Sequence, residues 1–164
     1  MTGARVGSGL DVHPVSDDPT RPLVLCGIVV PDARGLAGHS DGDVGAHAVA
    51  DALLGAAALG DLGERFGTDR PELAGADSLQ LLGEVVDDVR AAGWQLANLD
   101  LTLVAQRPRL APYRDPMRAA LGRVCHLDVG AVSVKFTTTD RLGAIGRGEG
   151  IAAWATSLLI DPRG

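Results

Sequence analysis

Aromatic residues are scarce in this chain, at 3% of 164 residues, and acidic residues outnumber basic ones, giving a formal net charge of −6. A nucleic-acid-binding protein is expected to carry a basic stripe and aromatic stacking platforms, and neither is visible. An acidic protein that binds an anion has to use metal ions and backbone N–H groups, because its overall field repels the ligand. The sequence therefore predicts no nucleic-acid partner.

Long hydrophobic runs and patterned cysteines are missing as well. Hydrophobic residues make up 46% of the chain, which suits a folded core, but no run is long enough to cross a bilayer. The first residues contain no apolar signal region. Cys26 and Cys125 have neither C-x-x-C nor zinc-finger spacing, which predicts two reduced, buried thiols. We expect a cytoplasmic protein without membrane contact.

The pattern that remains alternates strands with helices. Apolar and β-branched segments predict strands at residues 4–13, 23–30, 94–106, 131–139 and 150–160. Capping residues and apolar stripes predict helices at residues 43–59, 77–92 and 112–124. Residues 60–75 are expected to be irregular, and residues 143–150 to form a hairpin-like turn or an oligomer interface. We predict an α+β fold, with residues 1–164 as a single two-layer domain whose helices pack on one face of a mixed four- to five-stranded sheet.

The most informative residues are Asp11, His13 and His47. Asp11 and His13 lie two positions apart in a predicted strand, so their side chains leave the same face. His47 lies on a predicted helix that can pack across that face. One carboxylate and two imidazoles form a three-ligand zinc set, which leaves a fourth position open for chemistry. Each residue alone is more simply explained as a strand end or a core histidine, but the three together predict a zinc site.

Three neighbouring polar residues each allow two interpretations. Asp43, one turn before His47, is either another ligand or a carboxylate that stabilises the start of the helix. His39 precedes the same helix, and it either helps to hold an anion at the free N–H groups or is an exposed loop histidine. Asp61 either accepts hydrogen bonds from substrate hydroxyls or caps a turn.

Two segments that follow predicted strands suit phosphate and base binding. Residues 137–140 contain three threonines and Asp140, which suit phosphate oxygens and a hard cation such as Mg²⁺, although threonines are also ordinary strand residues. Two prolines stiffen residues 105–112, which either present backbone groups to a base or sugar or simply connect a strand to a helix. The glycine-rich residues 143–150 lack the G-K-[ST] ending of a P-loop.

Six short motifs follow one another along the chain. They are D-V-H at 11–13, H-S-D-G-D-x-x-x-H at 39–47, A-L-G-D-L-G at 58–63, G-A-D-S at 75–78, T-T-T at 137–139 and G-R-G-E-G at 146–150. Over nearly the whole chain this series resembles the 2-C-methyl-D-erythritol 2,4-cyclodiphosphate synthase family of the non-mevalonate isoprenoid pathway. The second and the last motifs are the most specific.

The resemblance implies a homotrimer with active sites between adjacent subunits. Such a lyase converts 4-diphosphocytidyl-2-C-methyl-D-erythritol 2-phosphate to 2-C-methyl-D-erythritol 2,4-cyclodiphosphate and releases CMP. The resemblance also implies zinc on the Asp11, His13 and His47 set, and magnesium or manganese on Asp140, where the family usually has Glu. Its catalytic residues, which donate hydrogen bonds to developing charge, would be His39 and Thr138.

The resemblance further implies which residues contact the substrate. Those around its phosphates and erythritol arm are Asp11, Val12, His13, His39, Ser40, Asp43, Asp61, Leu62, Gly63, Phe66, Gly67, Thr68, Asp69 and Arg70. Those around its cytidine diphosphate part are Ala105, Gln106, Arg107, Pro108, Arg109, Leu110, Ala111, Thr137, Thr138, Thr139 and Asp140, with Ala144 and Arg147 near the threefold axis.

Two other functions would use the same three metal ligands. A zinc-dependent phosphoesterase would attack with a bound water and release orthophosphate rather than CMP. A non-catalytic, zinc-stapled trimeric scaffold would close the metal site with a fourth protein ligand, for which Cys26 and His126 are the spare candidates.

Overall fold

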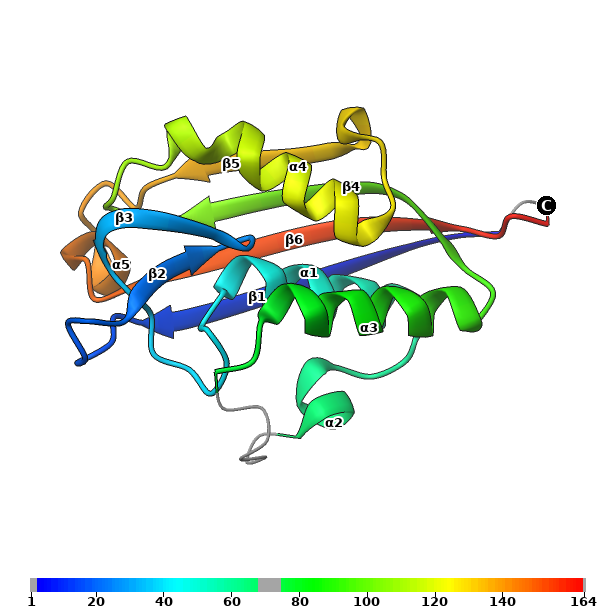
Figure 1. Ribbon diagram of the computed structural model, residues 1–164. Helices are drawn as coiled ribbons and strands as arrows, with labels where there is room; N and C mark the ends of the chain where they lie inside the picture. Colours follow the sequence, from blue (N-terminus) through cyan, green and yellow to red (C-terminus); the bar gives the residue numbers. More distant parts are fainter. Residues whose placement is uncertain (1–2, 68–74, 164) are drawn as a thin grey trace.

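The computed structural model describes residues 3–67 and 75–163, which form one four-stranded sheet, one hairpin and five α-helices. The strands are β1 (Ala4–Pro14), β2 (Pro22–Leu25), β3 (Ile28–Arg34), β4 (Gln95–Val104), β5 (Val132–Thr137) and β6 (Gly150–Ile160) (Figure 1). The α-helices are α1 (Val44–Ala57), α2 (Leu62–Phe66), α3 (Ser78–Ala91), α4 (Arg114–Cys125) and α5 (Gly143–Arg147), with short 3-10 turns η2 (Ala111–Tyr113) and η3 (Val129–Ala131).

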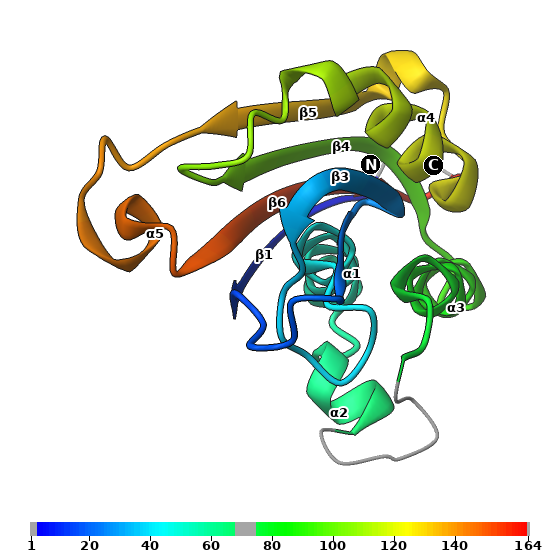
Figure 2. The same ribbon diagram turned by 60° about the vertical axis from the view of Figure 1, so that its left-hand side comes forward.

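The main sheet is mixed, with strand order β1-β6-β4-β5. β6 runs antiparallel to both of its neighbours. β4 and β5 run parallel to each other, and the chain between them contains helix α4. Helices α1, α3 and α4 cover one face of this sheet (Figure 2). The opposite face exposes apolar side chains of β1 and β6, among them Val6, Leu10, Val12 and Trp154. The predicted α+β class and mixed sheet are therefore confirmed, with four strands.

Strand β1 and helix α1 touch backbone to backbone because two glycines leave the inner face of the strand open. A Cβ atom on Gly7 would lie 1.9 Å from a carbonyl oxygen of α1, and a Cβ atom on Gly9 would lie 2.1 Å from the carbonyl oxygen of Ala48. No side chain fits at either distance, so glycine is required at both positions. This close contact fixes α1 against the strand that carries Asp11 and His13.

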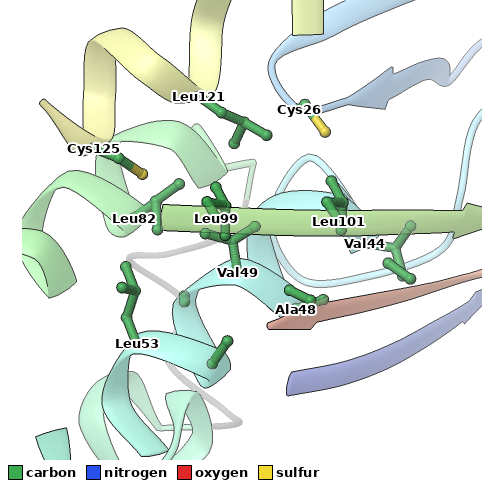
Figure 3. Packing of buried hydrophobic residues seen from close by; sticks show 14 of the residues in the cluster. Cys26, Val44, Ala48, Val49, Leu53, Leu82, Leu99, Leu101, Leu121 and Cys125 are labelled. Atoms are coloured by element: carbon green, nitrogen blue, oxygen red, sulfur yellow. The ribbon is translucent and has the colours of Figure 1, made fainter. Parts of the chain in front are cut away.

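The hydrophobic core fills the space between the sheet and its three covering helices. Val44, Ala48, Val49 and Leu53 of α1 face Leu99 and Leu101 of β4, while Leu82 of α3 and Leu121 of α4 close the cluster (Figure 3). The predicted alternation of β4 is observed, because its odd-numbered leucines are buried and the residues between them are more exposed. In the described ranges, no helix combines the length and apolar character that a membrane span requires.

The second predicted strand, residues 23–30, is wrong as a single element. It is a tight hairpin whose strands β2 and β3 are joined at Cys26 and Gly27, with φ angles of 52° and 72°. Positive φ at both central residues is the conformation that two-residue hairpin turns need. An apolar cysteine inside a continuous apolar run concealed this turn from the sequence pattern.

Two segments for which we predicted no helix contain short helices. Helix α2 lies within residues 60–75, and α5 occupies the position of the predicted hairpin-like turn at residues 143–150. Each is five residues long, which is too short for apolar periodicity to be visible. The predicted helix at residues 112–124 begins instead as the 3-10 turn η2 and continues as α4.

Candidate active site

The three predicted metal ligands converge between β1 and α1. Oδ2 of Asp11 lies 2.9 Å from Nε2 of His13 and 3.1 Å from Nδ1 of His47. The donor atoms all lie within 4.8 Å of one another, and the two imidazole rings are 5.2 Å apart. Within residues 3–67 and 75–163 this is the one group of three or more such side chains placed to hold a metal ion.

The electrostatics of this group suit a cation. Burial opposes ionisation of Asp11, but hydrogen bonds and charge from both histidines outweigh it and hold the pKa of that carboxyl well below its usual range. Burial likewise opposes protonation of His13, but its contact with Asp11 dominates and raises the pKa of the imidazole. A carboxylate with a lowered pKa beside two imidazoles is a donor set that zinc prefers, so these residues fit the predicted metal.

A pocket of about 430 Å³ opens over the three ligands. Its wall contains predicted substrate contacts from three separate segments of the chain, which are Asp11, Val12, His13, His39, Ser40, Leu62, Gly63, Phe66 and Gly67, together with the ligand His47. Leu62 also donates its backbone N–H to Asp51, a further lining residue that comes one turn after His47 on α1. A cavity of this size above an open metal site suits a small polar substrate.

Hydrogen bonds from Arg21 hold the loop that carries His39 and Ser40. The guanidinium of Arg21 donates to the carbonyl oxygen of Gly38 at 3.1 Å and to that of Ser40. The side chain of Ser40 is buried, whereas His39 is exposed at the rim of the pocket. Arg21 thus fixes the backbone on both sides of His39 and leaves its imidazole free to meet a ligand.

Asp43 lies outside the group of metal-ligand candidates and is not among the residues that line the pocket. Its carboxylate is fully buried and accepts four backbone N–H groups, two from α1 and two from the hairpin turn at Cys26 and Gly27, at 2.6–3.1 Å. Of the two interpretations left open by the sequence, the structural one holds. Asp43 caps α1 and ties the start of that helix to the β2–β3 turn.

Of the substrate contacts predicted around helix α2, only some lie at the pocket. The side chain of Asp61 caps α2 by accepting the N–H of Glu64 at 2.8 Å, and it is not among the residues that line the pocket. Phe66 is buried at the pocket wall with an exposed fraction of 6%. Three more predicted contacts in this segment, Thr68, Asp69 and Arg70, lie outside the described residues.

The remaining predicted contacts form a second group, away from the metal ligands. The parallel strands β4 and β5 end side by side, and the backbone N–H of Ala105 donates to Thr137 at 3.0 Å. The side chain of Gln106 accepts the N–H of Arg141 at 3.0 Å, which joins the two loops. Ala105 and Leu110 are both buried.

A second cavity, of about 360 Å³, lies beside this group and is lined by Arg107 and Pro108. It shares no lining residue with the pocket over the metal ligands. Thr138 accepts the N–H of Asp140 at 3.1 Å, and both side chains are exposed. The described chain therefore holds the predicted site in two separate parts.

The predicted residues of the glycine-rich segment lie on and next to α5. Arg147 pairs with Glu149 at 2.6 Å, and both side chains are exposed. Ala144 is exposed on the same short helix. Neither Ala144 nor Arg147 contributes to the walls of the two cavities.

Comparison with known proteins agrees with this geometry. A family model described as the YgbB family matches residues 4–160. The chain belongs to the YgbB family. A protein of Syntrophobacter fumaroxidans named 2-C-methyl-D-erythritol 2,4-cyclodiphosphate synthase is 54% identical over 155 residues, which cover 94% of this chain and 96% of that protein. The predicted family resemblance is confirmed.

Solved structures share the fold. One, described as 2C-methyl-D-erythritol-2,4-cyclodiphosphate synthase in a CDP-bound form, has a TM-score of 0.85 at 37% identity, covering 94% of this chain and 99% of that one. Another, described as IspF of Plasmodium falciparum in a CDP complex, has a TM-score of 0.84 at 29% identity and covers 98% of both chains.

Proposed function

We propose that this chain is a 2-C-methyl-D-erythritol 2,4-cyclodiphosphate synthase, a lyase that releases CMP. The observation that carries this function is the convergence of Asp11, His13 and His47 under a pocket whose rim holds His39. Membership of the YgbB family and the high identity to synthases support it. The CDP complexes of similar structures support a cytidine diphosphate substrate.

In this reaction an oxygen of the substrate's 2-phosphate forms a bond to the β-phosphorus. The bond from that phosphorus to the oxygen bridging the α-phosphate breaks, and CMP leaves with the bridging oxygen. The attacking oxygen is already anionic, so the protein has to supply positioning and charge stabilisation rather than a strong base. His39 and Thr138 are placed on exposed loops where they can donate hydrogen bonds to developing charge.

Two metal positions fit the residues present. Asp11, His13 and His47 would hold zinc, which when bound supplies Lewis-acid polarisation of a phosphate oxygen. Asp140 would hold magnesium or manganese. A single exposed carboxylate suits such an ion, because it takes most of its other ligands from substrate phosphates and water.

The two separate parts of the site support the proposal that this protein works as a homotrimer. Within one chain, the pocket over the metal ligands and the loops after β4 and β5 share no lining residues. The uncovered sheet face exposes Val6, Leu10 and Trp154, which gives a subunit an apolar surface to bury. A neighbouring subunit would then bring its cytidine-binding loops to the metal pocket of the first.

Subunit mixing tests this arrangement. We expect His47→Ala and Thr138→Ala proteins each to be inactive alone. After unfolding and refolding together they should recover part of the activity, because some interfaces then combine an intact metal set with an intact Thr138 loop. If each chain builds a complete site by itself, co-refolded mixtures of the two single variants will stay as inactive as the separate proteins.

The two alternative functions make different demands on the site. A structural zinc site needs a fourth protein ligand. In the described part of the chain, Cys26 lies at the hairpin turn and His126 at the end of α4, and both are outside the ligand group. An open position is thus available for substrate. The same openness would serve a phosphoesterase, which has to be separated from the synthase by its products.

Product analysis in ¹⁸O-labelled water separates the synthase from the phosphoesterase. Zinc-loaded protein with Mg²⁺ and the cytidyl diphosphate substrate should give cyclic diphosphate and CMP in equal amounts by phosphorus NMR. Neither product should contain ¹⁸O, since the attacking oxygen comes from the substrate. Labelled orthophosphate would instead establish hydrolysis by water.

A further inference from the structure

The metal-ligand candidate His47 has a second ring nitrogen that points into a small buried polar cluster. While its Nδ1 lies 3.1 Å from Asp11, its Nε2 lies 3.0 Å from Oγ of Ser78 and 3.1 Å from Oγ of Ser40. Both serines are buried, with exposed fractions of 1% and 6%. The imidazole is therefore held at both of its nitrogens.

Asp41 anchors this cluster from the far side of Ser78. Its Oδ1 lies 2.5 Å from the hydroxyl oxygen of Ser78, and its Oδ2 accepts the backbone N–H of the same residue at 3.2 Å. The contact brings together the starts of two helices, because Asp41 lies just before α1 and Ser78 is the first residue of α3. The backbone N–H of Asp41 also donates to the carbonyl oxygen of Ala76 at 3.0 Å.

The order of donors in this chain of contacts is fixed by what each group can do. An ionised carboxylate only accepts hydrogen bonds, so the single hydroxyl hydrogen of Ser78 goes to Asp41. The oxygen of Ser78 is then an acceptor, to which a hydrogen on Nε2 of His47 can be donated. Ser40, whose hydroxyl oxygen lies 3.1 Å from both Nε2 and the hydroxyl oxygen of Ser78, completes the cluster.

Nδ1, at 3.1 Å from Oδ2 of Asp11, is the ring nitrogen that faces the metal-ligand group. Without a metal this contact is a hydrogen bond to the carboxylate; a metal bound by Nδ1 would replace that hydrogen, and the remaining ring hydrogen would be the one on Nε2, which Ser78 accepts. We propose that Ser78 and Asp41 are positioning residues of the metal centre, forming an Asp41–Ser78–His47 relay that orients the imidazole and fixes its metal-binding nitrogen. This inference rests on the proposed function, in which Asp11, His13 and His47 bind zinc.

Zinc affinity, measured by competition with a chromogenic chelator, tests the relay. Loss of a hydrogen-bond partner behind a ligating histidine typically costs about 10–100-fold in metal affinity. We expect Ser78→Ala to weaken zinc binding by this factor, and Asp41→Asn, which keeps the size of the side chain, to weaken it in the same direction. Ser157→Ala is the matched control, since Ser157 is also fully buried but donates to Ala52, away from the ligands. Equal affinities in the Ser78 and Ser157 variants would overturn the relay.

A spectroscopic measurement on the wild-type protein keeps the test independent of how well the variants fold. In zinc-loaded protein labelled with ¹⁵N-histidine, the Nε2–H proton of His47 should be visible and protected from exchange with water. In Ser78→Ala it should exchange rapidly. A zinc-loaded wild-type protein in which His47 binds the metal through Nε2 would contradict the relay while leaving the metal centre intact. A wild-type protein that binds no zinc would overturn both the relay and the proposed metal centre.

Discussion

Replacing Asp43 by alanine should lower the free energy of unfolding more than any single substitution at the pocket rim. The carboxylate is fully buried and accepts N–H groups from both the start of α1 and the β2–β3 turn. Losing a helix N-cap costs about 1 kcal/mol. Leaving a buried donor without a partner costs about 1–3 kcal/mol more. This cost applies to the backbone N–H of Cys26, which is buried, and less to that of Gly27, which is exposed.

The expected loss for Asp43→Ala is therefore about 2–4 kcal/mol in the free energy of unfolding. Urea denaturation followed by circular dichroism measures it. Asp77→Ala is a suitable control, because Asp77 caps α3 in an exposed position and accepts only the N–H of Leu79, at 2.9 Å. We expect the control to lose about 1 kcal/mol.

The reasoning fails if Asp43→Ala is no less stable than the Asp77 control. A variant of unchanged stability whose kcat/KM falls sharply would show that the carboxylate contacts the substrate after all. That result would support the substrate contact predicted for Asp43 from the sequence.

Three further predictions concern the packing of β1 against α1, the pH dependence of zinc binding and the second metal site. Gly9→Ala should destabilise the fold by at least the roughly 1–3 kcal/mol of an overpacked core, measured by thermal unfolding, because the new methyl group would collide with the backbone of α1. Apparent zinc affinity should fall as the pH is lowered from about 8 to about 6 in chelator competition, because the raised pKa of His13 means that zinc has to displace a proton there; constant affinity would contradict this. Asp140→Ala should raise the Mg²⁺ concentration needed for half-maximal turnover by about tenfold or more without changing the zinc content, and an unchanged Mg²⁺ requirement would remove Asp140 from the second metal site.

The parts of the fold that sequence patterns predicted are those with a repeating signal. The alternation in β4 is of this kind, because buried leucines recur at every second position of the strand. The β2–β3 turn escaped because Cys26 continues an apolar run while its backbone adopts a positive φ. Five-residue helices such as α2 carry too few positions to show a period.

The candidate site was predictable where residue type alone limits the chemistry. A carboxylate and an imidazole two apart on a strand, with a second imidazole on a helix, leave few roles other than metal binding. The partners behind these ligands were not predictable, because Ser78 is separated from His47 by 31 positions and a serine at a helix start has an ordinary local explanation. Asp51 carried a weak signal, since it follows His47 by one helical turn on the same face.

The central claim is that Asp11, His13 and His47 hold a zinc ion whose open position accepts a phosphate of the substrate. Zinc K-edge X-ray absorption on the zinc-loaded protein, with and without bound substrate, tests it most directly. We predict two imidazole nitrogens and oxygen ligands in the free protein, with phosphorus appearing near the zinc when substrate binds. A sulfur ligand or a third imidazole, with no change on adding substrate, would show a closed structural site and contradict the claim.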